Sequence, residues 1–159
     1  MATTFSHSGR NGAAIGRRTS VAHAHPVHAM LSAYPLALFS TALVTDIAYA
    51  NSAQMQWANF SVWLITGGLI MGALAAVAGI VDALLGWRRG GRVRRGSSWP
   101  HAILTGLMLL LALVNAFVHS RDGWTSVVPG GLVLSVIVTV LALITSWQGF
   151  ALQAQGETR

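Results

Sequence analysis

Cysteine and lysine are both missing from this chain, and its few acidic residues are outnumbered by arginine. Without cysteine the chain can form neither a disulfide framework nor a thiolate site for a metal or an iron–sulfur cluster. Charged residues of either sign make up only 9% of the 159 residues, whereas soluble domains average about 25%. A water-soluble surface cannot be built from so few charges. Because hydrophobic residues make up 53%, the composition indicates a protein whose solvent is lipid.

The common sequence signatures of catalysis are missing as well. The chain has no G-x-S-x-G nucleophile motif, no phosphate-binding loop and no pair of carboxylates spaced for acid–base catalysis. The sequence therefore identifies no reaction, and it favours a protein that is not an enzyme.

The sequence does contain four apolar runs, each near or above the roughly 20 helical residues that cross a bilayer. They cover residues 29–50, 57–85, 101–119 and 127–151. We therefore predict an all-α fold, a polytopic four-transmembrane-helix bundle, as one membrane domain of residues 25–151. Residues 1–24 and 152–159 are predicted to be polar cytoplasmic tails. The first tail has too little apolar content to fold alone, so we expect it to be disordered.

A short arginine-rich hinge between the second and third runs sets the predicted orientation. Residues 87–96 hold five of the ten arginines, and positively charged loops stay on the cytoplasmic side during insertion. Both tails carry further arginines, whereas only Arg121 falls on the predicted outer side. We therefore predict a bacterial inner-membrane protein with both termini cytoplasmic. Arginines clustered beside apolar spans also argue against nucleic acid as a partner, despite the net charge of +6.

The first apolar run has an alternative interpretation. The arginine pair at residues 17–18, the apolar core of residues 30–44 and the A-Y-A triplet at residues 48–50 resemble a signal peptide with its cleavage site. Against this, the polar stretch before the core is long and contains three histidines and a proline. The sequence favours a retained first span and leaves cleavage open.

Histidines gather at the predicted cytoplasmic ends of the first and third spans. His25 and His28 are three residues apart, so they share one face of a helix, and His101 opens the third span on the same side. Asp82 enters this layer from the second span. Two imidazoles facing across a bundle suit a haem iron, and three imidazoles with a carboxylate suit a divalent transition metal. We therefore predict haem b binding by His28 and His101, or metal binding by His25, His28, Asp82 and His101.

The predicted outer ends hold a second, weaker set of polar residues. Asp46 near the end of the first span can pair with His119 at the end of the third, and Asn115 precedes His119 by about one turn. His119 is 18 residues from His101, about 27 Å along a helix, so these two histidines cannot share one ion. No charged residue is predicted near the membrane midplane, which argues against an ion channel, a voltage sensor or a central proton relay.

An ordinary structural interpretation of these residues stays open beside the cofactor hypothesis. Histidine near a helix end often only hydrogen-bonds to backbone or to lipid headgroups. Asp82 can simply pair with the arginines of the hinge. The tryptophans fall mostly at predicted span ends, which is the pattern of an interfacial belt and not of a binding site.

Several strings of residues carry a resemblance to a known family. They are H-P-V-H-A-M-L at residues 25–31, Y-P-L-A-L-F at residues 34–39, D-I at residues 46–47, W-L-I at residues 63–65, the glycine–alanine run of residues 68–79, Asp82, His101, Asn115, Arg121 and Leu134-Ser135. On these strings the chain, over residues 24–149, resembles the bacterial membrane-protein family catalogued as domain of unknown function 2231. Two positions depart from it: Ala29 replaces a second proline, and residues 146–150 lack the usual glycine-rich finish with a tyrosine.

The resemblance implies a four-helix integral membrane protein. Members of the family are sometimes fused to a Rieske-type iron–sulfur domain, which implies a role in respiratory electron transfer. From the resemblance and the histidines we expect a small electron-transfer or redox-accessory subunit, with the lipid bilayer and a respiratory or redox membrane complex as partners. Two alternatives stay open: a non-catalytic scaffold or anchor of a larger complex, and a small transporter of a neutral solute.

Overall fold

The computed structural model describes residues 26–88, 98–121 and 123–157. Four long α-helices and one turn of 3-10 helix make up most of these residues. The elements are α1 (Pro26–Ser52), α2 (Met55–Arg88), α3 (Ser98–His119), η1 (Trp124–Ser126) and α4 (Gly130–Glu157). The predicted all-α, four-span architecture is confirmed, and the described residues contain no strand. The predicted disordered tail, and most of the arginine hinge, lie outside the described residues.

All four helices are long and apolar enough to cross a membrane. Three of them enclose their predicted apolar runs: α1 and α2 extend a few residues beyond each end, and α3 starts three residues earlier and ends at His119 as predicted. The fourth begins at Gly130 and not at residue 127, because residues 127–129 form the turn that leads into it and end in proline. This helix also continues to Glu157, so much of the predicted C-terminal tail is helical.

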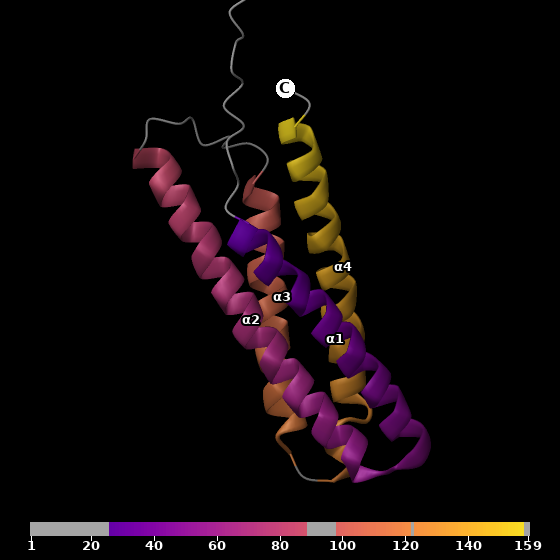
Figure 1. Cartoon of the computed structure of the whole chain (residues 1–159). Helices are drawn as coiled ribbons and strands as arrows, with labels where there is room; N and C mark the ends of the chain where they lie inside the picture. Colours follow the sequence, from indigo (N-terminus) through magenta and orange to yellow (C-terminus); the bar gives the residue numbers. More distant parts are fainter. Residues whose placement is uncertain (1–25, 89–97, 122, 158–159) are drawn as a thin grey trace, which may run out of the picture.

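The helices form two antiparallel hairpins, α1 with α2 and α3 with α4, and the hairpins pack on each other (Figure 1). One end of the bundle holds the start of α1, the end of α2, the start of α3 and the end of α4. We call this the hinge end, because the arginine hinge connects α2 to α3 there. The other end, where α1 turns into α2 and α3 leads to α4, is called the opposite end.

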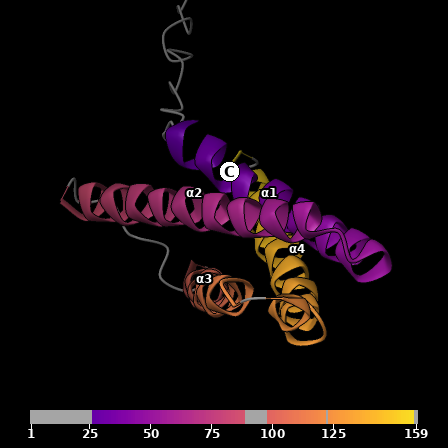
Figure 2. The ribbon, with the colours of Figure 1, turned by 90° about the horizontal axis from the view of Figure 1, so that it is seen from below.

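The two hairpins are inclined to each other. In Figure 2, α3 is seen nearly end-on while α2 is seen along much of its length. The 34 residues of α2 extend about 50 Å at 1.5 Å per residue, which is longer than the roughly 30 Å of bilayer hydrocarbon, so a spanning α2 is long enough to cross a bilayer at a tilt. In Figure 1 the last turns of α2 diverge from the other helices at the hinge end.

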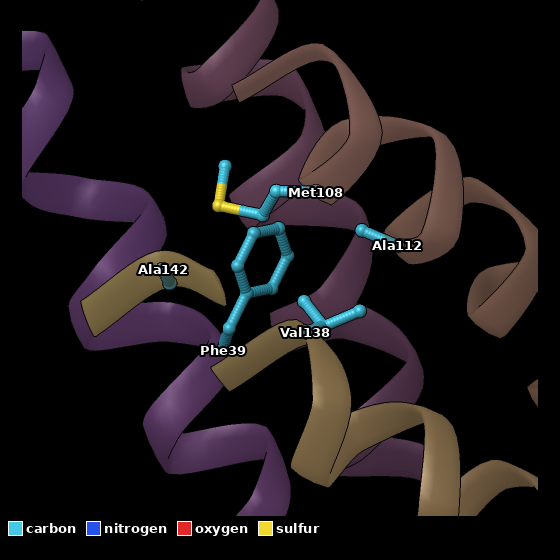
Figure 3. Close-up of a cluster of buried hydrophobic side chains, with 5 residues drawn as sticks. All are labelled: Phe39, Met108, Ala112, Val138 and Ala142. Atoms are coloured by element: carbon cyan, nitrogen blue, oxygen red, sulfur yellow. The ribbon is translucent and has the colours of Figure 1, made fainter. Parts of the chain in front are cut away.

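The apolar core lies midway between the hairpins. Phe39 of α1 points between Met108 and Ala112 of α3 and Val138 and Ala142 of α4, and all five side chains are at most 3% exposed (Figure 3). Many other large apolar side chains face outward, where lipid covers them in a spanning helix. Because Phe39 belongs to this core, α1 is an integral part of the bundle and not an appendage to it.

Glycines on α2 let α1 and α3 approach closely. A Cβ atom placed on Gly68 would overlap the ring of Phe39, and one on Gly72 would lie 2.6 Å from Leu109 of α3. Gly68 and Gly72, which are four residues apart on α2, therefore serve helix packing inside the bundle. A Cβ atom on Gly67 would lie 3.6 Å from Leu38, an ordinary contact, so close approach is confined to one side of α2.

Candidate functional site

A cavity of about 360 Å³ lies at the hinge end and is lined by residues of all four long helices. Its size falls within the roughly 300–1,000 Å³ of small-molecule sites in proteins. The core forms one wall through Met108 and Ala142, and the exposed Phe150 is also part of the lining, so the cavity reaches the surface of the bundle. Both histidines predicted to bind haem, His28 and His101, line this cavity.

His28 is held in one orientation by the second helix. Its Nδ1 atom lies 2.9 Å from the backbone oxygen of Ala75, and a carbonyl oxygen can only accept a hydrogen bond. In the neutral ring Nδ1 therefore carries the proton, and Nε2 has a free lone pair. A backbone carbonyl on the second nitrogen is the usual partner of a histidine that ligates iron or zinc. Gly79 provides room for the ring, since a Cβ atom there would lie 3.1 Å from its Cε1 atom.

His101 and Thr105 contribute polar atoms without partners to the same cavity. They are four residues apart on α3 and therefore share one face of the helix. His101 Nδ1 and Thr105 Oγ1 are both buried, and neither makes a hydrogen bond. Thr145, which lines the cavity from α4, differs: its hydroxyl donates to the carbonyl oxygens of Leu141 and Ala142 in its own helix. Two polar groups on α3 are thus left for a ligand.

The predicted metal set is not assembled among the described residues. His25 lies outside them, and Asp82 of α2 is not part of the cavity lining. Within the described part of the chain, no three histidine or acidic side chains lie close enough together to hold a metal ion. Two imidazoles around one cavity therefore remain, a donor set that suits haem iron better than a bare cation, which usually takes four or more ligands.

A second polar cluster lies at the opposite end and is completely buried. His119 Nε2 lies 2.9 Å from Asp46 Oδ1, so the predicted contact between α1 and α3 is confirmed. Ser135 of α4 donates to Asp46 Oδ2 over 2.5 Å, and Asn115 Nδ2 donates to Ser135 Oγ over 2.9 Å. None of the four side chains is more than 4% exposed. We call these four residues the Asp46 network.

The hydrogen-bond partners of His119 limit where the protons of the Asp46 network can lie. His119 Nδ1 lies 3.0 Å from the backbone oxygen of Asn115, so it must donate there. Nε2 then either donates to the Asp46 carboxylate from an imidazolium or accepts a proton from a neutral Asp46. Both states carry no net charge, which a buried pair in a membrane protein requires. Gly131 allows α4 to start here, since a Cβ atom on it would lie 2.7 Å from the His119 ring.

The arrangement of the Asp46 network does not support nucleophilic catalysis. Ser135 is hydrogen-bonded to Asp46, and both ring nitrogens of His119 have other partners, so the imidazole does not activate the hydroxyl. The cluster is also closed to substrate. Its hydrogen bonds join α1, α3 and α4, so the cluster serves to hold these three helices together.

Sequence reasoning missed Thr105 and Ser135 as functional positions. A hydroxyl in an apolar span carries no distinctive signal, because most such side chains only bond to a carbonyl of their own helix, as Thr41 and Thr66 do. Ser135 appeared in the family resemblance but was given no role, and for Thr105 the available signal was spacing. Thr105 follows His101 by four residues, which places the two on one helix face.

Comparison with known proteins identifies a family and nothing finer. A family model described as a predicted membrane protein of the group DUF2231 matches residues 24–158. Neither the curated proteins nor the solved structures include a match to this chain.

Proposed function

The chain belongs to the DUF2231 family of predicted membrane proteins, and we propose that it is a small redox-accessory subunit of a membrane electron-transfer complex. In this proposal the cavity at the hinge end binds a redox-active group beside His28 and His101. The observation that carries it is that these two histidines, 73 positions apart in the sequence, line one cavity. The arginines of the hinge and tails support a bacterial inner-membrane location with this end on the cytoplasmic side.

Haem b is the first candidate for the bound group. An iron with two axial imidazoles needs only two protein ligands, whereas a divalent cation would also need His25 or other donors. The Nδ1 bond of His28 to Ala75 supports iron ligation through Nε2, because it fixes both the tautomer and the ring orientation. Haem would supply one-electron transfer, and the surrounding apolar side chains would exclude water from it.

The first test is an absorbance spectrum of the protein, purified in detergent after expression with haem available. We expect a Soret band at near one haem per chain, and we expect His28→Ala and His101→Ala each to remove it. His7→Ala, at a histidine assigned no role, is the matched control and should keep the band. His101→Met should retain haem with a shifted spectrum and a raised reduction potential, because thioether ligation favours ferrous iron.

Each other result would contradict part of this proposal. A Soret band that survives both alanine substitutions would remove the two histidines from the iron. A colourless protein without bound metal would end the haem hypothesis for the isolated chain. Copurification with a larger complex would then favour the scaffold function, in which the histidines only shape the packing.

A further inference from the structure

Haem iron would leave part of the cavity chemistry unexplained. Ligation by ring nitrogens uses His28 and His101, but it offers no partner to the Thr105 hydroxyl. A buried polar group without a hydrogen bond costs about 1–3 kcal/mol, so a cavity that contains one is suited to a ligand that supplies the partner. The unpaired hydroxyl and His101 Nδ1 both belong to α3, one turn apart, and both line the cavity.

From this juxtaposition we infer that the cavity at the hinge end binds the headgroup of a membrane quinone. Thr105 Oγ1, and His101 Nδ1 where it carries the ring proton, donate hydrogen bonds to one quinone oxygen. The inference rests on the proposed function, since it requires the cavity to be a redox ligand site, but it does not require iron. Both ligands would occupy the same cavity, so quinone is the alternative to haem as the redox group of the proposed site.

The chemistry of the lining matches a quinone in three respects. The walls are mostly apolar, with Leu36, Met108 and Phe150 among them, which suits a flat apolar ring. The polar atoms that lack a partner, His101 Nδ1 and Thr105 Oγ1, both belong to α3, which suits a carbonyl oxygen of the ligand. The cavity reaches the bundle surface beside the exposed Phe150, where lipid surrounds a spanning helix, and quinones are dissolved in that lipid.

The reduced form of the ligand also finds a partner. A quinol hydroxyl is a donor, and the unprotonated Nε2 of His28 is an acceptor on the cavity wall. Phospholipid headgroups fit less well. They are charged, and the described residues that line the cavity include neither arginine nor acidic side chains.

The test measures binding of a radiolabelled short-chain ubiquinone to the full chain in lipid nanodiscs, with empty discs as background. Thr105→Val is nearly isosteric and removes only the hydroxyl that lacks a partner, so we expect about tenfold weaker binding. Thr145→Val lines the same cavity but removes a hydroxyl that is already bonded within its own helix, so we expect less than about a twofold change. Thr105→Ser keeps the donor and should retain affinity within about threefold.

The outcomes separate this inference from the proposed function. Saturable binding with the expected order of the three variants supports a quinone site. The inference is wrong if nothing binds above the empty discs, or if Thr105→Val and Thr145→Val weaken binding equally. A Soret band in the same preparation without quinone binding would leave the haem proposal standing alone. If circular dichroism shows that Thr105→Val does not fold, the quinone affinities of Thr105→Ala and Thr105→Ser are compared instead. Weaker binding by the alanine variant supports the role of the hydroxyl, and equal binding contradicts it.

Discussion

At Asp46, two simple substitutions should differ clearly in their effect on stability. In Asp46→Asn the amide nitrogen can donate to Nε2 of a neutral His119, and the amide oxygen can accept from Ser135. This reproduces the neutral state of the pair, so we expect the free energy of unfolding to change by less than about 1 kcal/mol. Asp46→Ala leaves His119 Nε2 without a partner and the Ser135 hydroxyl without an acceptor, both of them buried, and it should cost about 3 kcal/mol.

Thermal unfolding in detergent, or unfolding against a denaturant, measures this difference. Thr41→Ala is the matched control, since it removes an exposed hydroxyl that bonds only to its own helix on α1. Equal losses for the asparagine and alanine variants would indicate that the negative charge of Asp46 itself is required, and would exclude the neutral state of the network.

The sequence predicts which polar residues share an end of the bundle, but not how their side chains pair. His28 and His101 were placed together because both start spans on the same side, and Asp46 was paired with His119 on similar grounds. Ser135 could not be found in this way, since its role depends on the rotation of α4 about its axis. That rotation is set by packing around Phe39 and Val138, which involves residues about 100 positions apart.

At the scale of the helices, the neighbouring glycines of α2 provide a matched comparison. A methyl group at Gly68 overlaps the buried ring of Phe39, so Gly68→Ala should destabilise the bundle by about 1–3 kcal/mol. A methyl group at Gly67 meets Leu38 at an ordinary distance, and Gly67→Ala should leave stability unchanged or raise it by up to about 1 kcal/mol. Measuring the free energy of unfolding of both variants tests this packing of α1 on α2. Similar stabilities of the two variants would contradict the close contact at Gly68.

The length and hydropathy of the apolar runs predict that four helices exist, but they do not predict the angles at which these helices pack. Four runs of adequate length gave four helices, because lipid leaves a backbone no other way to satisfy its polar groups. The inclination between the hairpins depends instead on how side chains of neighbouring helices pack against each other. Gly67 and Gly68 are indistinguishable in the sequence and differ only in what each one faces.

For the whole molecule, the distribution of arginine and the position of the two chain ends both indicate the same orientation in the membrane. The described chain starts at Pro26 and ends at Glu157, and both residues lie at the hinge end. The sequence places nine of the ten arginines at this end or in the tails attached to it. An orientation with the hinge end in the cytoplasm would also place His28 and His101 nearer the cytoplasmic face, so electrons, or the protons that quinol oxidation releases, would be exchanged on that side.

The absence of native cysteine makes this orientation directly measurable, since any introduced cysteine is the only thiol in the chain. We expect Ser120→Cys, exposed at the opposite end, to react with a membrane-impermeant maleimide on intact spheroplasts. Ser8→Cys and Gly91→Cys should react only after the membrane is opened, because positively charged segments are retained inside. Reaction of Gly91→Cys on intact cells, with Ser120→Cys protected, would reverse the topology. Loss of the Ser8→Cys label from the mature protein would instead indicate cleavage of the first span, which would remove Phe39 and Asp46 from the bundle.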